Sequence, residues 1–322
     1  MNASDVMGAK RVSVVGAGLV GMGWAIVFAR AGLQVQVHDL QPEAIDAGIA
    51  LAADQIAGLA RHGLLSEAPE TVIARLHPAP TLAQAVEGVA WLQESVLERV
   101  DVKRQLMEQI EAIGNPDLVV GSSTSGIPAS EFVAGLAIAS RVIVAHPVNP
   151  PYLVPVVELV PSPWTDEATI RLADAFMRSL GQSVVTVRRE VAGFVLNRLQ
   201  AVLLREAWAL VQEGVASCED IDKTVRDGLG WRWSFMGPFE TIDLNAPGGV
   251  ADYAQRLGPL YQSIAQSRSH EQPWDSALIK EVESQRRAQV SFDELSARRA
   301  WRDEQLMAFA KQRLVGATDA AG

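Results

Sequence analysis

The most constraining feature of this sequence is a glycine-rich turn between a short strand and a helix. Gly16, Gly18 and Gly21 follow the β-branched run Arg11–Val15 and open an apolar stretch of helical length, after which a second strand-like run ends at His38. In this strand–turn–helix setting, the G-x-G-x-x-G spacing predicts a dinucleotide-binding unit.

Each glycine of the turn has an expected physical role. Gly16 makes the tight turn, Gly18 lets the backbone approach a pyrophosphate, and Gly21 lets helix and strand pack closely. Asp39 follows the second strand-like run, 18 residues beyond Gly21. A carboxylate there hydrogen-bonds the ribose 2′-hydroxyl and repels a 2′-phosphate, so the sequence favours NAD over NADP. The alternative is a plain βαβ turn with Asp39 in solvent.

Strand-like and helical patterns alternate as far as about residue 188. Further strands are expected at 89–92, 118–120, 141–145, 156–160 and 183–187, and helices at 42–60, 66–76 and 100–113. This alternation predicts an α/β fold of the Rossmann type with a doubly wound, mainly parallel sheet. Later patterns, at 194–213 and 293–313, are helical. We therefore expect a dinucleotide-binding domain over 1–190 and an all-helical domain over 191–322.

Composition limits the partners of the chain. It has 28 Lys and Arg against 38 Asp and Glu, a net charge of −10, which argues against nucleic-acid binding. The one cysteine, Cys218, fits a reducing compartment. No apolar run reaches the roughly 18 residues that span a bilayer, and the first ten residues do not have the order of a signal peptide. We expect a cytoplasmic protein without a membrane partner and predict no metal site.

Polar side chains stop two of the later strands, at the edge of a parallel sheet where ligands bind. Ser125 belongs to a cluster of small hydroxyl residues after one strand, and His146 directly follows another. Glu158 lies inside the apolar strand 156–160, where an unpaired carboxylate is costly to bury. A His146–Glu158 pair would be a general base for an alcohol, with Ser125 hydrogen-bonded to the alcohol oxygen. The residues alone leave open a core histidine bonded to a backbone carbonyl and a glutamate paired with an arginine.

One more polar residue lies where the helical region begins. Asn197 stands among Phe194, Leu196 and Leu199. The residues alone favour an interaction at the helix start, with a contact to substrate as the alternative.

Together these segments resemble the 3-hydroxyacyl-CoA dehydrogenase superfamily, and within it the lambda-crystallin and L-gulonate 3-dehydrogenase branch. The likeness covers nearly the whole chain, in the segments VVGAGLVGMGWA, LQESVLERVDVK, SSTSG, AHPVNPPYLVPVVELVP, EVAGFVLNRLQ, GLGWRWSFMGPFETIDLN and ARRAWRDEQLM. The resemblance implies reversible oxidation of a 3-hydroxy group by NAD, with a helical domain that binds substrate and forms a homodimer.

The resemblance also implies a role for each site residue. His146 with Glu158 would be the catalytic base pair, Ser125 would contact substrate and nicotinamide, and Asn197 would hold the substrate oxygen. The other matches are cofactor contacts: Leu19, Val20, Asp39, Glu98, Lys103 and Asn149.

Two departures from the acyl-CoA members favour a small free hydroxy acid. Those members usually carry a lysine-rich insertion that meets the CoA phosphates, whereas no lysine lies between Lys10 and Lys103 here. The segment around Arg232 is also longer, and Trp231 and Trp233 flank this arginine so that stacking could fix it for a substrate carboxylate. We therefore predict an L-gulonate 3-dehydrogenase, with 3-hydroxyacyl-CoA or L-carnitine dehydrogenase as alternatives.

Two further alternatives stay open. Arg232 could be a surface arginine whose neighbouring tryptophans pack an interface. The chain could also be a crystallin-like structural protein that binds NADH, although Ser125, His146, Glu158 and Asn197 at the family's spacing favour catalysis.

Overall fold

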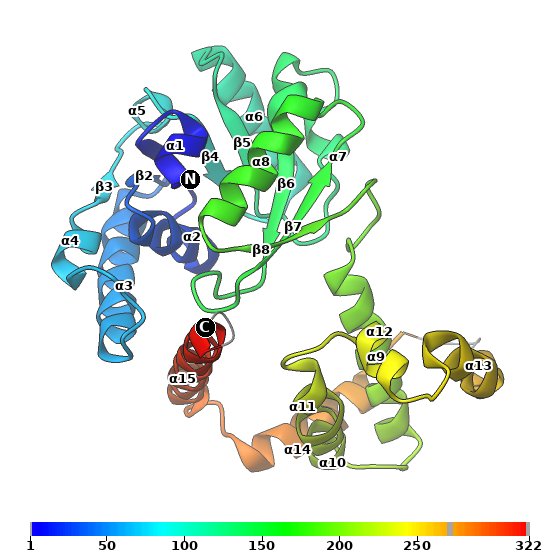
Figure 1. The fold of residues 1–322 in the computed structure, drawn as a ribbon. Helices are drawn as coiled ribbons and strands as arrows, with labels where there is room; N and C mark the ends of the chain where they lie inside the picture. The colour runs from blue at the N-terminus through cyan, green and yellow to red at the C-terminus, as the bar shows by residue number, and fades with distance from the viewer. Residues whose placement is uncertain (1, 269–272, 320–322) are drawn as a thin grey trace. The chain divides into compact units, whose positions relative to one another are not determined.

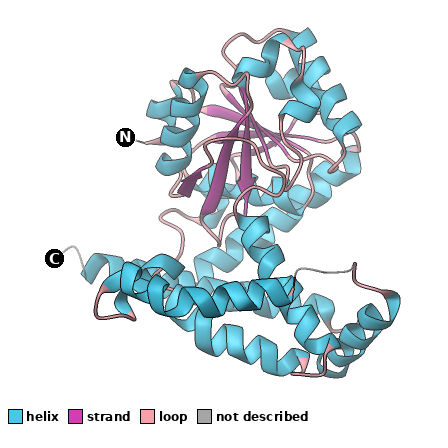
Figure 2. Ribbon diagram, turned by 90° about the vertical axis from the view of Figure 1, so that its right-hand side faces the viewer, coloured by secondary structure: helices cyan, strands magenta, loops and turns pink. Residues whose placement is uncertain are grey.

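The computed structural model of the chain describes residues 2–268 and 273–319. The chain forms two compact units by its contacts. The first holds the residues up to Leu199 together with those from Arg299 onward, and the second is Gln200–Arg298. In the described residues, all strands belong to the first unit and the second is helical (Figures 1 and 2).

The first unit is built on an eight-stranded sheet with the order β3-β2-β1-β4-β5-β6-β7-β8. The strands are β1 (Arg11–Val15), β2 (Gln34–His38), β3 (Leu76–Pro78), β4 (Trp91–Glu94), β5 (Val119–Ser122), β6 (Val142–Pro147), β7 (Val156–Pro161) and β8 (Ser183–Thr186). Neighbours pair in parallel except β6 and β7, which pair antiparallel. The expected doubly wound, mainly parallel sheet is confirmed, and the strand order reverses between β1 and β4.

Helices cover both faces of this sheet. One face packs on α1 (Ala3–Met7), α2 (Leu19–Arg30), α3 (Pro42–Arg61) and α8 (Glu167–Ser179). The other packs on α5 (Leu82–Val86), α6 (Val100–Ile113), α7 (Ser130–Val133) and the 3-10 helix η1 (Ala137–Arg141). Stacked rings of Trp24, Phe28 and Phe176 fill the first face. Apolar side chains are buried on both faces of the sheet, and this packing stabilises the strands. The polar residues that follow the strands are therefore held in defined positions.

The segment between α3 and β4 differs from the single helix expected over 66–76. Within 66–76 only Pro69–Ile73 is helical (α4), and β3 begins at Leu76 as a short parallel strand beside β2. Pro69 fits the first turn of a helix because its missing N–H has no partner there in any case. An edge strand such as β3 also tolerates a proline, here Pro78. Both prolines are therefore compatible with the short helix α4 and the edge strand β3.

The chain passes from one unit to the other within two helices. α9 (Leu196–Gln212) leaves the first unit and α15 (Leu295–Asp319) returns to it. The helices between them are α10 (Cys218–Lys223), the π-helix η2 (Thr224–Leu229), α11 (Gly230–Trp233), α12 (Pro238–Leu244), α13 (Gly249–Ser267) and α14 (Ser276–Gln289). The helical C-terminal region is therefore confirmed. None of the described helices combines the length and apolar character that a membrane span requires.

Helix α15 packs on α3 of the first unit. Met307 is buried over Gly58 of α3, where an added Cβ would lie 3.2 Å from the methionine Cε. Glu304 lies 3.1 Å from His62 and 3.7 Å from Arg61. By its contacts, the C-terminal part of the predicted helical domain 191–322 thus belongs with the sheet unit. The role of 191–322 in substrate binding stays a prediction.

Candidate active site

The glycine turn between β1 and α2 has the geometry expected of each glycine. Gly16 has a φ of +103°, and a Cβ there would lie 2.3 Å from the backbone oxygen of Ser95. A Cβ at Gly21 would lie 1.9 Å from the backbone oxygen of Gly16, so only glycine lets the helix pack this closely. At Gly18, no atom of the described residues beyond its two chain neighbours lies within 4 Å of an added Cβ. Backbone therefore faces open space where a pyrophosphate would lie.

Asp39 follows β2 and stabilises this turn by hydrogen bonds. Its carboxylate accepts hydrogen bonds from the backbone N–H groups of Ala17 at 2.9 Å and Gln41 at 3.0 Å. α2 begins at Leu19 with no side-chain cap, so the N–H groups of its first turn, including that of Val20, need partners from outside the helix. Such a helix start attracts phosphate.

A cavity of about 450 Å³ opens at the turn. It is lined by Gly16, Gly18, Asp39 and Ser95, and by apolar side chains that include Leu82, Val96, Leu97 and Leu106. The open space at Gly18, the carboxylate and the apolar wall together fit a dinucleotide bound where the strand order reverses.

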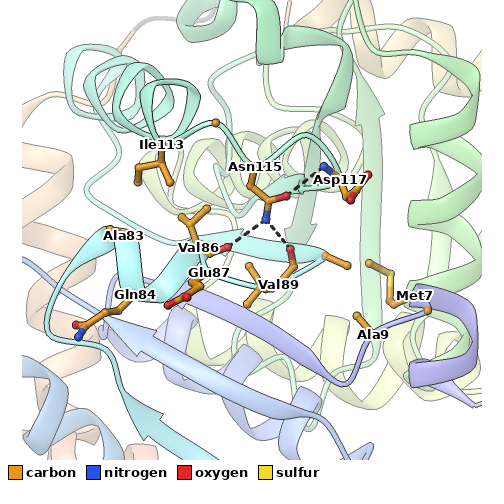
Figure 3. A pocket seen from close by; sticks show the side chains of 14 residues that line it. Met7, Ala9, Ala83, Gln84, Val86, Glu87, Val89, Ile113, Asn115 and Asp117 are labelled. Atoms are coloured by element: carbon orange, nitrogen blue, oxygen red, sulfur yellow. Dashed lines mark hydrogen bonds between the residues drawn. The ribbon is translucent and has the colours of Figure 1, made fainter.

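A larger hollow, of about 670 Å³, lies at the amino ends of β1, β4 and β5 (Figure 3). Asn115 crosses it, and its amide donates to the carbonyls of Val86 and Val89 and accepts from the N–H of Asp117. This amide ties together the loops that precede β4 and β5. Because ligands of parallel sheets bind at the carboxyl ends of the strands, we assign this hollow a structural role.

β6 and β7 bring His146 and Glu158 together. The two strands pair antiparallel, with His146 directly opposite Glu158. His146 Nδ1 lies 2.8 Å from Glu158 Oε2, and the side chains are 7% and 1% exposed. The other carboxylate oxygen accepts from the N–H groups of Val195 and Leu196, each at 2.9 Å. The carboxylate therefore has three donors.

These donors hold Glu158 ionised, which determines the tautomer of the imidazole. Burial alone would raise the pKa of Glu158, but the hydrogen bonds from His146 and from the two backbone N–H groups outweigh burial and hold that pKa below its usual value. An ionised carboxylate only accepts hydrogen bonds, so Nδ1 of His146 carries a proton. Nε2 of the neutral ring then keeps a lone pair that can accept a proton.

Glu98 organises the hydroxyl loop after β5. Its Oε1 accepts from Thr124 Oγ1 at 2.8 Å, the N–H of Ser125 at 2.7 Å and the Ser125 hydroxyl at 3.1 Å. Its Oε2 lies 3.1 Å from Nζ of Lys103. Burial would raise the pKa of Glu98, but the charge of Lys103 and these hydrogen bonds hold it below its usual value. Ser125 therefore donates to Glu98 and keeps its lone pairs for another donor.

Glu94, at the end of β4, belongs to the same network and is absent from the residues that the sequence patterns indicate. Its two oxygens lie 2.9 and 3.1 Å from Nζ of Lys103, and both side chains are fully buried. The hydroxyl of Ser122 and the N–H of Val96 also donate to it. A carboxylate two residues after the strand-like run 89–92, with a lysine on the next helix, is the signal that could have found it.

Asn197 lies in the first turn of α9 and, by its contacts, in the first unit. Its Nδ2 donates to the backbone oxygen of Ser125 at 2.6 Å. This contact joins residues far apart in the sequence, so it is not the local interaction at the helix start. The Phe194 ring packs beside His146, with ring centroids 5.7 Å apart. The structure thus brings Ser125, His146, Glu158 and Asn197 into one hydrogen-bonded region.

Two predicted site residues stand apart from this region. Asn149 is exposed after β6, and no described residue hydrogen-bonds its side chain. Arg232 lies on α11 in the second unit, half-buried, and no described residue pairs with its guanidinium. The expected stacking of Trp231 and Trp233 on Arg232 is not present, and these two residues are 71% and 40% exposed.

Two family models match the chain. Residues 11–191 match the NAD binding domain of 3-hydroxyacyl-CoA dehydrogenase, and residues 193–294 match its C-terminal domain. Lambda-crystallin from Oryctolagus cuniculus is 41% identical over 304 residues, which cover 93% of this chain and 95% of that protein. L-carnitine dehydrogenase from Streptomyces coelicolor is 38% identical over 277 residues, which cover 86% and 83%.

Solved structures resemble the fold over most of its length. An NAD⁺-dependent dismutase, 5-formyl-3-hydroxy-2-methylpyridine 4-carboxylic acid 5-dehydrogenase, has a TM-score of 0.78 at 26% identity and covers 93% of this chain and 97% of its own. (S)-3-Hydroxybutyryl-CoA dehydrogenase from Ralstonia eutropha has a TM-score of 0.65 at 28% identity and covers 80% and 88%.

Proposed function

Because the chain belongs to the 3-hydroxyacyl-CoA dehydrogenase family and is an NAD-dependent hydroxy dehydrogenase, we propose that it oxidises the 3-hydroxy group of a small free acid, L-gulonate. The observation that carries the proposal is the buried His146–Glu158 pair next to the hydroxyl loop of Ser125. NAD, when bound, supplies the hydride acceptor.

We assign the cofactor contacts to the glycine turn and its surroundings. Gly16, Gly18 and Gly21 with the N–H groups of Leu19 and Val20 hold the pyrophosphate, and Asp39 binds the adenosine ribose. Glu98 and Asn149 contact the nicotinamide half. Lys103 is 1% exposed and bonded to two carboxylates, so we propose that it acts through Glu98 rather than by touching the cofactor.

The residues around His146 divide the chemistry among themselves. Nε2 of His146 takes the proton of the substrate hydroxyl as hydride leaves its carbon, and Glu158 stabilises the imidazolium that forms. The single proton of the substrate hydroxyl goes to His146, so the Ser125 hydroxyl would turn its own proton from Glu98 to the substrate oxygen and donate to it. The amide of Asn197 holds the same substrate oxygen, exchanging its bond to the backbone of Ser125 for one to substrate.

The free-acid assignment rests on Arg232. Its guanidinium has no partner among the described residues, and a guanidinium matches a carboxylate in a two-pronged contact. The chain also has no lysine between Lys10 and Lys103 for the phosphates of CoA. Among the relatives, the L-carnitine dehydrogenase and the pyridine carboxylic acid dehydrogenase are named for compounds with a free carboxylate.

We expect Arg232→Ala to lower kcat/KM for L-gulonate about 10- to 100-fold, because a hydrogen-bonded charge contact of roughly 1.5–3 kcal/mol is lost. Steady-state kinetics of the wild type and the variant with L-gulonate, 3-hydroxybutyrate, L-carnitine and 3-hydroxybutyryl-CoA measure kcat/KM for each substrate. Arg226, an exposed arginine of the same unit that pairs with Asp227, is the matched control, and Arg226→Ala should leave kcat/KM unchanged. If kcat/KM of the wild type were higher for the CoA ester by orders of magnitude, the free-acid proposal would be wrong. If kcat/KM were highest for L-carnitine, L-carnitine and not L-gulonate would be the substrate.

We also propose that the protein is a homodimer that pairs through its helical unit. Apolar side chains of that unit are strongly exposed in the single chain: Val202, Trp231, Phe235, Phe239, Leu244 and Leu260. Burial of such side chains drives stable association. We expect light scattering to give a mass about twice the 34.6 kDa of one chain. A mass of one chain at micromolar concentration would contradict the dimer.

The state of the single cysteine supports a reducing, cytoplasmic location. Cys218 is free and buried at the start of α10. Burial and the nearby carboxylate of Asp222 raise the pKa of its thiol, which keeps it protonated and unreactive. A structural thiol of this kind suits a compartment where disulfides do not form.

A further inference from the structure

The chain makes a strained turn just before α9. Gly193 and Phe194 have φ angles of +75° and +50°, both in the left-handed region. Glycine adopts this conformation freely, whereas a residue with a Cβ is strained there. Within the part of the chain that the structure describes, Phe194 is the one non-glycine residue with a positive φ. Such strain persists only where the surroundings impose it, and it is common at functional sites.

The backbone of the turn determines where the first N–H groups of α9 point. The N–H groups of Val195 and Leu196 follow the turn directly, and both donate to Oε1 of Glu158 at 2.9 Å. The first N–H groups of a helix have no partner within the helix, and their partial positive charge favours a carboxylate. Glu158 on β7 thus caps α9 from the sheet, through the oxygen that does not face the imidazole.

The side chain of Phe194 contacts the other member of the base pair. It is fully buried, and its ring centroid lies 5.7 Å from that of His146, with 55° between the planes. It belongs to an apolar cluster with Val144 of β6 and Val160 of β7, the two strands that carry the pair. Glycine would adopt this backbone conformation at lower cost, so the ring is what explains a phenylalanine here. The ring occupies space into which the imidazole could otherwise rotate.

We propose that the left-handed turn Gly193–Phe194 positions the His146–Glu158 base pair. Its backbone directs two N–H donors to Glu158, and its ring holds the imidazole with Nδ1 on the carboxylate and Nε2 free for the substrate. Phe194 is a positioning residue, since it acts through His146 and Glu158. The inference rests on the proposed function, because it takes His146 as the base that receives the substrate proton.

Gly193→Ala tests the backbone of the turn and keeps the ring. An added Cβ would lie 3.6 Å from Cβ of Asn197, an ordinary contact, so strain at the φ of +75° is the main effect. Relief of this strain moves the two N–H groups away from Glu158, and a carboxylate with fewer donors binds a proton more readily. We expect kcat with NAD and L-gulonate to fall about tenfold and the acid limb of its pH profile to move to higher pH. The Kd for NADH should be unchanged.

Phe194→Leu tests the ring and keeps the glycine. Leucine is apolar but does not fill the plane beside the imidazole, so His146 gains rotational freedom. We expect kcat to fall about tenfold, with KM and the Kd for NADH unchanged, because a displaced base lowers only the rate of proton transfer. Nitrogen NMR of the histidine side chains in the protein without ligand reports the tautomer. Wild-type His146 should carry its proton on Nδ1, and the variant should show a mixture of tautomers. The signal that is lost in His146→Gln identifies His146.

Two matched controls make the same changes away from the base pair. Gly181→Ala places a Cβ at a φ of +79°, with no described atom beyond its chain neighbours within 4 Å. Phe176→Leu removes a fully buried ring on the opposite face of the sheet. Both controls should lower the melting temperature, while kcat, the acid limb and the His146 tautomer stay those of the wild type.

The proposal is overturned if Gly193→Ala and Phe194→Leu unfold cooperatively and keep the wild-type kcat, acid limb and tautomer. Losses of kcat no larger than those of the two controls would overturn it equally. If Phe194→Leu does not fold, Gly193→Ala decides, since it changes no buried side chain. The NMR measurement needs no substrate, so it separates a failure of the turn from a failure of the proposed function. Retention of turnover by His146→Gln would contradict the proposed function itself.

Discussion

Replacing His146 with glutamine is expected to lower kcat about 10²- to 10⁴-fold, the usual contribution of a positioned general base. Glutamine has a similar reach and can still donate to Glu158, whose carboxylate is buried with two further donors from Val195 and Leu196. It has no group that can take a proton where Nε2 of the imidazole lies. Steady-state kinetics with NAD and L-gulonate measure the loss.

The Kd for NADH should be unchanged in the same variant, because the glycine turn and Asp39 lie on other strands of the sheet. His77 provides a matched control: it lies on the edge strand β3 and is bonded to Gln34. His77→Gln should leave kcat within about twofold of the wild type, the range of a surface substitution. If His146→Gln retained wild-type turnover, His146 could not be the base.

The parts of the fold that the sequence predicts are those encoded locally. The glycine turn, Asp39 and the long strands come from apolar runs and turn residues within about 30 positions, and all of them form. β3 was not predicted because only three residues pair there, at an edge where no hydrophobic run is needed. The helical pattern of residues 293–313 predicts α15, but hydrophobic periodicity does not determine which unit Met307 packs against.

The site shows the same limit. The apolar runs place His146 at the end of one strand and Glu158 inside another, yet they cannot show that the two residues meet. Their contact depends on the antiparallel register of β6 with β7, which puts the two residues opposite each other. Lys103 reads in the sequence as a residue of an amphipathic helix, and its burial between Glu94 and Glu98 depends on how α6 packs on the sheet. Charge pairs between distant segments are set by tertiary packing and leave no periodic signal.

Lys103→Met is expected to lower the free energy of unfolding by about 3–5 kcal/mol, because it leaves the buried carboxylate of Glu94 without its charge partner. Glu94 would keep only neutral donors, the N–H of Val96 and the hydroxyl of Ser122. Glu98 is 41% exposed on its side chain, so water and the hydroxyl loop can compensate there. Urea unfolding of the protein without ligand measures the change.

The double variant Glu94→Gln/Lys103→Met separates an uncompensated charge from a simple loss of contacts. It should recover most of the lost stability, since a buried amide with hydrogen-bond partners costs far less than a buried lone charge. Lys223, whose exposed i,i+4 pair with Glu219 is a surface pair, is the control, and Lys223→Met should cost about 0–1 kcal/mol. A loss at Lys103→Met no larger than that control, or a double variant less stable than the single one, would show that the buried charge of Glu94 does not depend on Lys103. In that case the positioning of Glu98, and with it the orientation of the Ser125 hydroxyl, would have to come from the loop alone.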